Sequence, residues 1–334
     1  MGERIGDRML VADEASEMLR RLESRPWFSW QRSMLQLRGS VLPSIWRRVL
    51  GMTLYSVVIV LADQRGYRVD LPVLGNLIPS IVLGLLLVFR TNTAYDRFWE
   101  GRKIWGSLLS TARLMVRNMN FVVRATEEGD RAEQVAYMRM VPALIASIKH
   151  HLRGEPLAPA VVARVVRRSP QGGVDGSALM PLDLMNGLAD YFQRLYGARR
   201  IDAHVFVELN RHLDSLTLDL GRTQRILRTP LPHAYAVHLK HLLLIYCLTL
   251  PFQFVGALGW STVPAVGIIS FALLGIEEIG QEIENPFGYD ANDLPLDEFC
   301  RLLALDVERL IEYGEQSLGG PLPSSRTDLP SLKS

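Results

Sequence analysis

Cysteine is scarce in this sequence, and the charges of opposite sign nearly cancel. There are two cysteines among 334 residues, Cys247 in an apolar run and Cys300 in a charged one. The chain therefore has neither a disulfide framework nor a cysteine-based metal site. The 37 basic and 35 acidic residues leave a formal net charge of +2. Because no basic face stands out from the balancing acids, the composition argues against a nucleic-acid-binding protein.

Motifs of catalysis are missing as well. The seven histidines include His150-His151 and the group His233, His238 and His241, but no HExxH motif and no carboxylate at ligand spacing completes a site. The sequence also lacks a GxSxG motif, a glycine-rich phosphate loop and a readable Ser/His/Asp arrangement. Neither an alternating strand pattern nor an internal repeat occurs. These absences favour an all-α protein that is not an enzyme and requires no cofactor.

Apolar residues make up 48% of the chain, and they are unevenly distributed. Residues 242 to 276 carry no charge at all, whereas residues 277 to 297 are strongly acidic. Gly256, Gly259 and Pro264 divide the uncharged run into two segments of about 17 residues, each long enough to cross a membrane as a helix. The run therefore predicts a transmembrane helical hairpin rather than one long buried helix.

Two further spans precede this hairpin. The first apolar run, 49–62, is extended toward the N-terminus by Ile45 and Trp46, past two arginines that can snorkel to the interface. After a short polar turn at 63–70, residues 71–89 form a second run, and a neighbouring helix or a pore water satisfies the backbone near Pro79. The sequence is thus that of an integral membrane protein with four transmembrane helices.

The distribution of basic residues predicts the orientation. Four spans place both termini on one side, and no hydrophobic signal-peptide core occurs near the N-terminus. By the positive-inside rule this side is the cytoplasm and the membrane is the inner (plasma) membrane. The basic residues that flank the spans on this side are Arg47, Arg48, Arg90, Arg97, Arg102, Lys103 and Lys240.

The long segment between the second and third spans is charged and helical in pattern. Apolar residues recur at spacings of three and four, and glycine- and proline-containing stretches separate the helices. The helices are predicted at 112–123, 131–152, 178–197 and 203–228. The chain then divides into N-terminal cytosolic or interfacial helices (1–43), transmembrane helices 1 and 2 (44–89), a helical cytosolic domain (90–240), transmembrane helices 3 and 4 (241–276), an acidic cytosolic helical region (277–315) and a flexible tail (316–334).

The N-terminal segment leaves two interpretations open. Trp27, Phe28 and Trp30 lie near arginines, which suits an amphipathic helix at the level of the lipid headgroups. The same residues also suit packing against the cytosolic domain.

Residues 81–106 have no turn signal and predict one helix that passes from an apolar to an aqueous environment at Arg90. Ile81, Leu85 and Phe89 form one stripe on this helix, at i, i+4 and i+8. On periodicity alone, a packing face inside a monomeric bundle explains the stripe more simply than a pore lining does.

The acidic stretch after residue 276 also has two interpretations. Glutamates end a helix, a turn follows at 285–288, and Asp290, Asn292, Asp293 and Asp297 come next. Hard cations bind several oxygens of this kind, although the spacing is not that of an EF-hand. On spacing alone, an acidic loop that pairs with the arginines after residue 90 is the simpler explanation.

Two motifs resemble those of the bestrophin family. The run from Arg90 to Arg102, with Trp105-Gly106, is similar to the family signature that follows the pore-lining segment, and residues 283–288 with 292–296 are similar to the acidic motif in its bacterial form. Gly39-Ser-Val-Leu42 ahead of the first span fits too. The similarity extends from about residue 27 to residue 312.

The resemblance implies a homopentameric ion channel with four spans per subunit and an axial pore. Its hydrophobic neck is placed at Ile81, Leu85 and Phe89, and a second, cytosolic constriction at His204, with Ile201 as the alternative. Such a neck gates by dewetting. The family implies passive conduction of chloride or other small anions, and some bacterial members favour monovalent cations, so selectivity stays open.

The resemblance also implies a calcium clasp in some relatives. Asp290 and Asp293 match its two aspartates, and Glu282 and Asn285 match positions that contribute carbonyls, but the unbroken acidic run of the animal proteins is absent. The expected partners are membrane lipid, small inorganic ions and further copies of the chain. Two rivals are a membrane-embedded hydrolase or transferase with a metal at Asp290 and Asp293, and a non-conducting scaffold.

Overall fold

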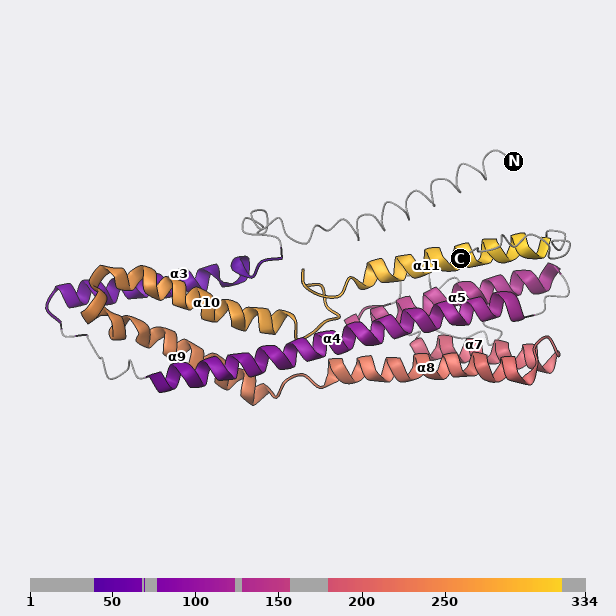
Figure 1. The fold of residues 1–334 in the computed structure, drawn as a ribbon, viewed down its shortest axis with the longest axis horizontal. Helices are drawn as coiled ribbons and strands as arrows, with labels where there is room; N and C mark the ends of the chain where they lie inside the picture. The colour runs from indigo at the N-terminus through magenta and orange to yellow at the C-terminus, as the bar shows by residue number, and fades with distance from the viewer. Residues whose placement is uncertain (1–38, 68, 70–76, 124–127, 157–179, 320–334) are drawn as a thin grey trace, which may run out of the picture. The chain divides into compact units, whose positions relative to one another are not determined.

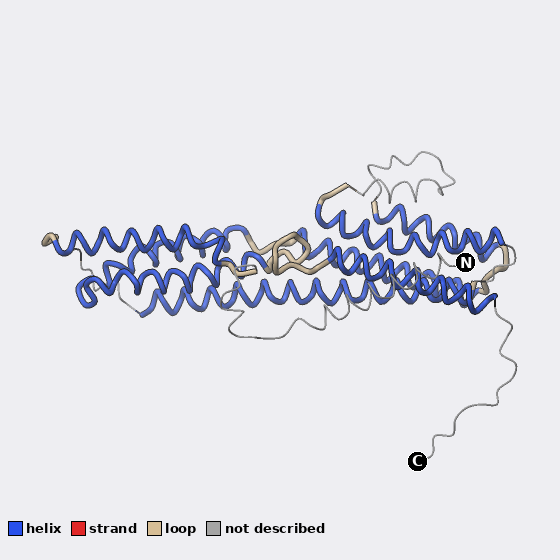
Figure 2. The backbone as a smooth tube through the Cα atoms, turned by 90° about the horizontal axis from the view of Figure 1, so that it is seen from above, coloured by secondary structure: helices blue, strands red, loops and turns tan. Residues whose placement is uncertain are grey.

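The computed structural model describes residues 39–67, 69, 77–123, 128–156 and 180–319. All regular elements in these ranges are helical and none is a strand, as the sequence predicts (Figure 2). The predicted N-terminal helices up to residue 38, residues 71–76 of the second span and the tail from residue 320 lie outside the described ranges.

The described helices, labelled in Figure 1, belong to two compact units. The first unit contains the described residues up to Trp105 together with Gly221–Pro295, and the second contains Gly106–Leu220 and the described residues from Leu296 onward. Helices α4 and α8 contribute residues to both units. The helices are α3 (Leu42–Gln64), α4 (Leu77–Val122), α5 (Glu128–Arg153), α7 (Pro181–Gly197), α8 (Ala203–Arg228), α9 (His233–Leu258), α10 (Thr262–Glu282) and α11 (Leu296–Gly319).

The predicted division of the uncharged run into two helices joined by a turn is confirmed in the first unit. Helices α9 and α10 are joined by a single 3-10 turn, Gly259–Ser261, and α10 packs against both α9 and α3 (Figure 1). Gly259 has φ of +50°, a conformation that residues with a Cβ atom rarely adopt. Both helices extend beyond the uncharged run. Helix α9 begins before it with polar turns, and α10 ends after it with polar turns.

Two apolar stretches of the described chain are long enough to cross a membrane, Leu42–Gln64 and His233–Glu282, the second of which contains the hairpin. Only 17% and 28% of the residues in their most apolar windows are buried within the chain, whereas the core helix of a soluble protein is mostly buried. Exposed apolar surface of this extent fits lipid or another subunit better than water. On α3 it forms a stripe of Leu42, Trp46, Leu50, Leu54, Val58 and Leu61.

The prediction of one continuous helix over 81–106 is confirmed. The separate helix predicted from residue 112 is wrong, because α4 continues without a break to Val122. The buried face of α4 repeats at spacings of three and four residues through Trp105, Leu108, Ala112 and Met115. The helical pattern therefore continues through residue 112 without a break. Pro79 lies in the first turn of α4, where its missing N–H group costs no helical hydrogen bond.

In the second unit, α5 packs against α7 and α11. The rings of Tyr137 and Tyr191 stack at 3.9 Å, and the Arg194 guanidinium lies 5.6 and 5.8 Å from their centroids. The predicted helices at 131–152, 178–197 and 203–228 agree with α5, α7 and α8 to within three residues. This unit holds the polar helices, whereas the first unit holds the helices with apolar outer faces.

Candidate functional site

The predicted neck stripe lies on the outer face of α4. Ile81, Leu85 and Phe89 are 64%, 54% and 56% exposed, whereas Leu83 and Leu87 between them are 3% and 2% exposed. Because successive residues of a helix are separated by about 100°, the two sets point in opposite directions. The stripe is therefore not a surface on which α4 packs within its own chain.

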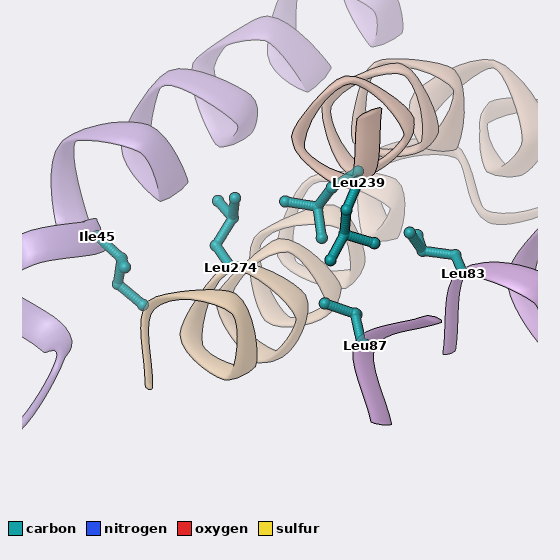
Figure 3. Packing of buried hydrophobic residues seen from close by; sticks show 6 residues of the cluster. Ile45, Leu83, Leu87, Leu239 and Leu274 are labelled. Carbon is teal, nitrogen blue, oxygen red and sulfur yellow. The ribbon is translucent and has the colours of Figure 1, made fainter. Parts of the chain in front are cut away.

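The opposite face of α4 is held by α9 and α10. Leu83 and Leu87 belong to a buried cluster in which they point toward Leu239 of α9, with Leu274 of α10 beside them (Figure 3). The Tyr235 hydroxyl, at the start of α9, donates a hydrogen bond of 2.9 Å to the carbonyl oxygen of Leu86. These contacts fix which side of α4 remains uncovered.

A group of charged side chains from all four helices of the first unit lies where the apolar section of α4 ends. We call Arg48 (α3), Arg90 (α4), Lys240 (α9), Glu277 and Glu278 (α10) the helix-end charge cluster. Arg90 Nη1 lies 2.7 Å from Glu277 Oε1, and both side chains are 2% exposed. Glu277 also lies 3.7 Å from Lys240 Nζ and 4.0 Å from Arg48, which bonds Glu278 at 3.1 Å. This pair differs from the predicted pairing of the acidic loop with the arginines after residue 90, because Glu277 is buried within α10 and its partner is Arg90 itself.

Further along α4, Arg97 binds backbone rather than acids. Its guanidinium donates to the carbonyl oxygens of Ile226, at 2.6 Å, of Thr229, and of Glu284, at 3.1 Å. The first two carbonyls lie at the C-terminal end of α8, where helical carbonyls lack intrahelical partners. Sequence reasoning missed this role, because carbonyl partners leave no trace in residue identities.

Gly101 lets the turn after α10 approach α4 closely. A Cβ atom at this position would lie 2.9 Å from Cγ of Pro286 and 3.3 Å from the ring of Phe287, both of which are buried. The carboxylate of Glu284 accepts the backbone N–H of Leu231 at 3.0 Å. The signature run on α4 and the acidic motif thus meet in the first unit, and the linker between α8 and α9 joins them.

The residues of the predicted calcium clasp lie at the end of α10 and in the loop after it, where their side-chain oxygens accept hydrogen bonds from donors of the same loop. Oδ2 of Asp293 accepts the backbone N–H of Asp290 at 2.7 Å, and Oε2 of Glu282 accepts the Asn292 amide at 2.7 Å. Asn285 Oδ1 faces the N–H of Phe287 at 3.4 Å. The loop is a turn stabilised by its own side chains.

Calcium takes six to eight oxygens, from carboxylates and from backbone carbonyls. No group of three or more acidic, histidine or cysteine side chains in the described ranges is arranged to hold a metal, whereas the predicted clasp also draws on backbone carbonyls. Calcium binding therefore stays a prediction from the resemblance, and we derive no functional step from it.

The two residues predicted for the cytosolic constriction differ in exposure. Ile201 is 5% exposed, whereas His204, in the first turn of α8, is exposed. His204 lines a cavity of about 470 Å³ together with Asn118, Glu208 and Arg211. Nearby, burial lowers the pKa of His212, whose Nε2 lies 3.1 Å from the Asn118 amide.

Asp297, the last acid of the motif region, joins α11 to α5 in the second unit. Its carboxylate oxygens lie 2.6 Å from Lys149 Nζ and 2.8 Å from Arg153. Hydrogen bonds from these two cations lower the pKa of Asp297 to about 2. One turn nearer the middle of α11, burial raises the pKa of the Cys300 thiol to about 11, so this thiol is protonated and unreactive at neutral pH.

Asp297→Asn is expected to lower the melting temperature at neutral pH. The folded-state pKa lies below the unfolded value of about 3.9, so the pair stabilises the fold above that value and loses this effect as the pH falls toward 2. The melting temperatures of the two proteins in detergent, measured from pH 7 to pH 2, should converge at the acidic end. A constant difference over this range would contradict the ion-pair explanation.

The comparisons with known proteins agree with these motifs. The family model described as "Bacterial/Fungal Bestrophin protein" matches residues 20–309. A voltage-dependent anion channel-forming protein of Nostoc is 44% identical over 84% of this chain and 91% of its own length. Another protein of that name, from Synechocystis, is 42% identical over 85% of this chain and 92% of its own length.

A solved structure agrees as well. A crystal structure of a bacterial bestrophin homologue from Klebsiella pneumoniae, carrying one mutation, is similar with a TM-score of 0.71 and 26% identity, over 80% of this chain and 99% of that chain. The family model covers most of the sequence, including both motifs and the four apolar segments. This chain belongs to the bestrophin family, in its bacterial and fungal branch.

Proposed function

We propose that this chain is a subunit of an anion channel in which α4 lines the pore and Ile81, Leu85 and Phe89 form the hydrophobic neck. The observation that carries the proposal is the division of α4 into two faces. One face is packed against α9 and α10 of the same subunit, and the other presents three large apolar side chains to the outside. Family membership and the names of the relatives favour a channel over an enzyme or a scaffold.

The helix-end charge cluster supports four spans with both termini in the cytoplasm. Arg48 and Lys240 lie near the starts of α3 and α9, Arg90 lies at the end of the apolar section of α4, and Glu277 lies near the end of α10. Ion pairs among these residues bring the starts of α3 and α9, the end of α10 and the end of the apolar section of α4 close together. Three of the five side chains are cationic, as expected for the cytoplasmic side of an inner membrane.

The exposed apolar surfaces support assembly into a homopentamer, which the family resemblance implies. A single copy of the stripe encloses nothing, so a pore needs several copies of α4 around an axis. The stripe on α3, from Leu42 to Leu61, then faces lipid or a neighbouring subunit. The domain division at residues 43, 89, 240, 276 and 315 belongs to this proposal, with the cytosolic regions at 90–240 and 277–315.

The neck gates conduction through desolvation. A ring of apolar side chains offers an ion no hydrogen bonds or charges in place of its hydration shell, so a narrow ring excludes water and imposes a high barrier. A small widening lets water enter and removes most of that barrier. The stripe carries no charge and does not distinguish anions from cations. Selectivity for chloride or other anions follows from the relatives' names, and a monovalent-cation channel of the same architecture is the alternative.

His204 is the better candidate for the cytosolic constriction, because its side chain is exposed while that of Ile201 is buried within its unit. A ring of imidazoles would line the path with polar groups that can hydrogen-bond water. The titratable and charged groups that face it are Glu208 and Arg211 on α8, and α4 contributes the neutral Asn118.

A metal-dependent hydrolase or transferase is the enzymatic rival, with Asp290 and Asp293 as metal ligands. It is disfavoured because Asp293 caps the backbone of Asp290 and the neighbouring carboxylate of Glu282 accepts the Asn292 amide. A non-conducting scaffold would leave ion flux through liposomes at the background level.

Changing Ile81, Leu85 and Phe89 together to Ala is expected to increase resting currents in planar bilayers several-fold, because a wider and less apolar ring wets more readily. The matched control changes Leu50, Leu54 and Val58 to Ala, which removes a similar exposed apolar surface from α3. Currents equal to wild type in the neck variant, at equal protein incorporation, would contradict the neck assignment.

His204→Ile is expected to lower the current, because a ring of apolar side chains in place of polar imidazoles raises the desolvation barrier for an ion. Bilayer recordings at one fixed pH and equal protein incorporation measure this effect. If the variant keeps the wild-type conductance, His204 does not line the conducting path.

A further inference from the structure

We infer that Arg90 is a positioning residue for the neck, and that its ion pair with Glu277 holds α4 in the rotational setting that directs the stripe toward the pore. This inference rests on the proposed function. Arg90 immediately follows Phe89, the last residue of the stripe, on the same rigid helix. Phe89 is 56% exposed and Arg90 is 2% exposed, so a rotation that moves one side chain moves the other.

The contacts on the back of α4 differ in how strongly they resist rotation. Leu83 and Leu87 pack against leucines of α9 and α10 (Figure 3), and apolar contacts of this kind are non-directional. The Arg90–Glu277 contact, at 2.7 Å with both partners almost fully buried, depends strongly on distance and direction. Separating its members would leave the buried Arg90 without an acidic partner. The ion pair therefore selects one rotational setting together with the directional hydrogen bond from Tyr235 to Leu86.

The surroundings of the pair are asymmetric. Glu277 lies within 4.0 Å of two further cations, Lys240 and Arg48. Arg90 forms an ion pair only with Glu277 among the described residues, and its Nε atom has no hydrogen-bond partner there. Loss of the Arg90 charge consequently leaves Glu277 compensated, whereas loss of the Glu277 charge leaves Arg90 buried without an acid. The two single substitutions should therefore have different effects.

The backbone of α10 leaves room for the Arg90 side chain. A Cβ atom at Gly280 would be in ordinary van der Waals contact with Arg90, 3.9 Å from Nε and 4.0 Å from Cδ. Glu277 and Gly280 are three residues apart and so lie on one face of α10. Arg90 thus contacts α10 at two successive positions on one face, the charged Glu277 and the small Gly280. These contacts hold the end of the neck against the end of α10.

Arg90→Gln tests the inference in bilayer recordings. We expect the resting open probability to rise about tenfold, since the loss of one charged hydrogen bond shifts a two-state equilibrium by roughly that factor. The conductance of the fully open channel should not change, because the neck side chains themselves are intact. Arg47→Gln is the matched control, as it removes an exposed arginine from the same level of the first unit.

Thermal stability separates positioning from folding. Arg90→Gln should melt close to the wild type, whereas Glu277→Gln should melt clearly lower than Glu278→Gln, its neighbour on α10. If Arg90→Gln does not fold, the double variant Arg90→Met with Glu277→Leu removes both charges together and should show the raised open probability. An unchanged open probability in whichever of these variants folds would overturn the inference.

The neck variant described above separates failure of the Arg90 inference from failure of the neck assignment itself. If changing Ile81, Leu85 and Phe89 to Ala raises the current while Arg90→Gln does not, the neck stands and Arg90 has no positioning role. If neither substitution changes the current, the proposed neck itself is wrong.

Discussion

The need to compensate the buried carboxylate of Glu277 with cations is the constraint on which the first unit depends. This carboxylate lies where the chain passes from apolar to polar sequence on four helices, and all four of them contribute charged side chains to the group around it. Removing such charges from water is costly unless they are paired at close range. The requirement for pairing therefore fixes the positions of the four helices along their axes relative to one another. Apolar packing alone would allow them to slide.

The same constraint explains how one helix serves two environments. On the apolar side of Arg90, α4 has a back face of leucines packed on α9 and α10 and an outer face of three large apolar side chains. On the polar side, Arg97 binds the carbonyls at the end of α8, and Gly101 permits close contact with the turn after α10. The motif shared with the family is thus a set of contacts that join the proposed pore segment to the end of α8 and to the turn after α10.

Much of this architecture could be predicted from the sequence, because the relevant signals are local. The hairpin was predicted from Gly259 and Pro264 within an uncharged run, and α8 from its periodicity. The limits of α4 were harder, because a helix has no local marker where it passes from one environment to another. The exposure of Ile81, Leu85 and Phe89 could not be predicted, since a packing face and a pore lining have the same spacing.

The long-range polar contacts were also beyond sequence reasoning. The acids after residue 276 indicated pairing with arginines, but not which pairs form or that Arg97 would bind carbonyls. The acidic loop suggested cation binding because its residues match a family pattern. In the structure those side chains cap their own turn, since the Asp293 carboxylate is directed at the backbone of Asp290, and composition gives no indication of this direction.

The central claim, that several copies of this chain form a passive anion-conducting pore, is tested most directly by the reversal potential of the purified protein in a planar bilayer with a potassium chloride gradient. The account predicts a steady current that reverses close to the equilibrium potential of chloride. A current that reverses at the potassium potential would contradict anion selectivity, and the absence of any current would contradict the channel itself.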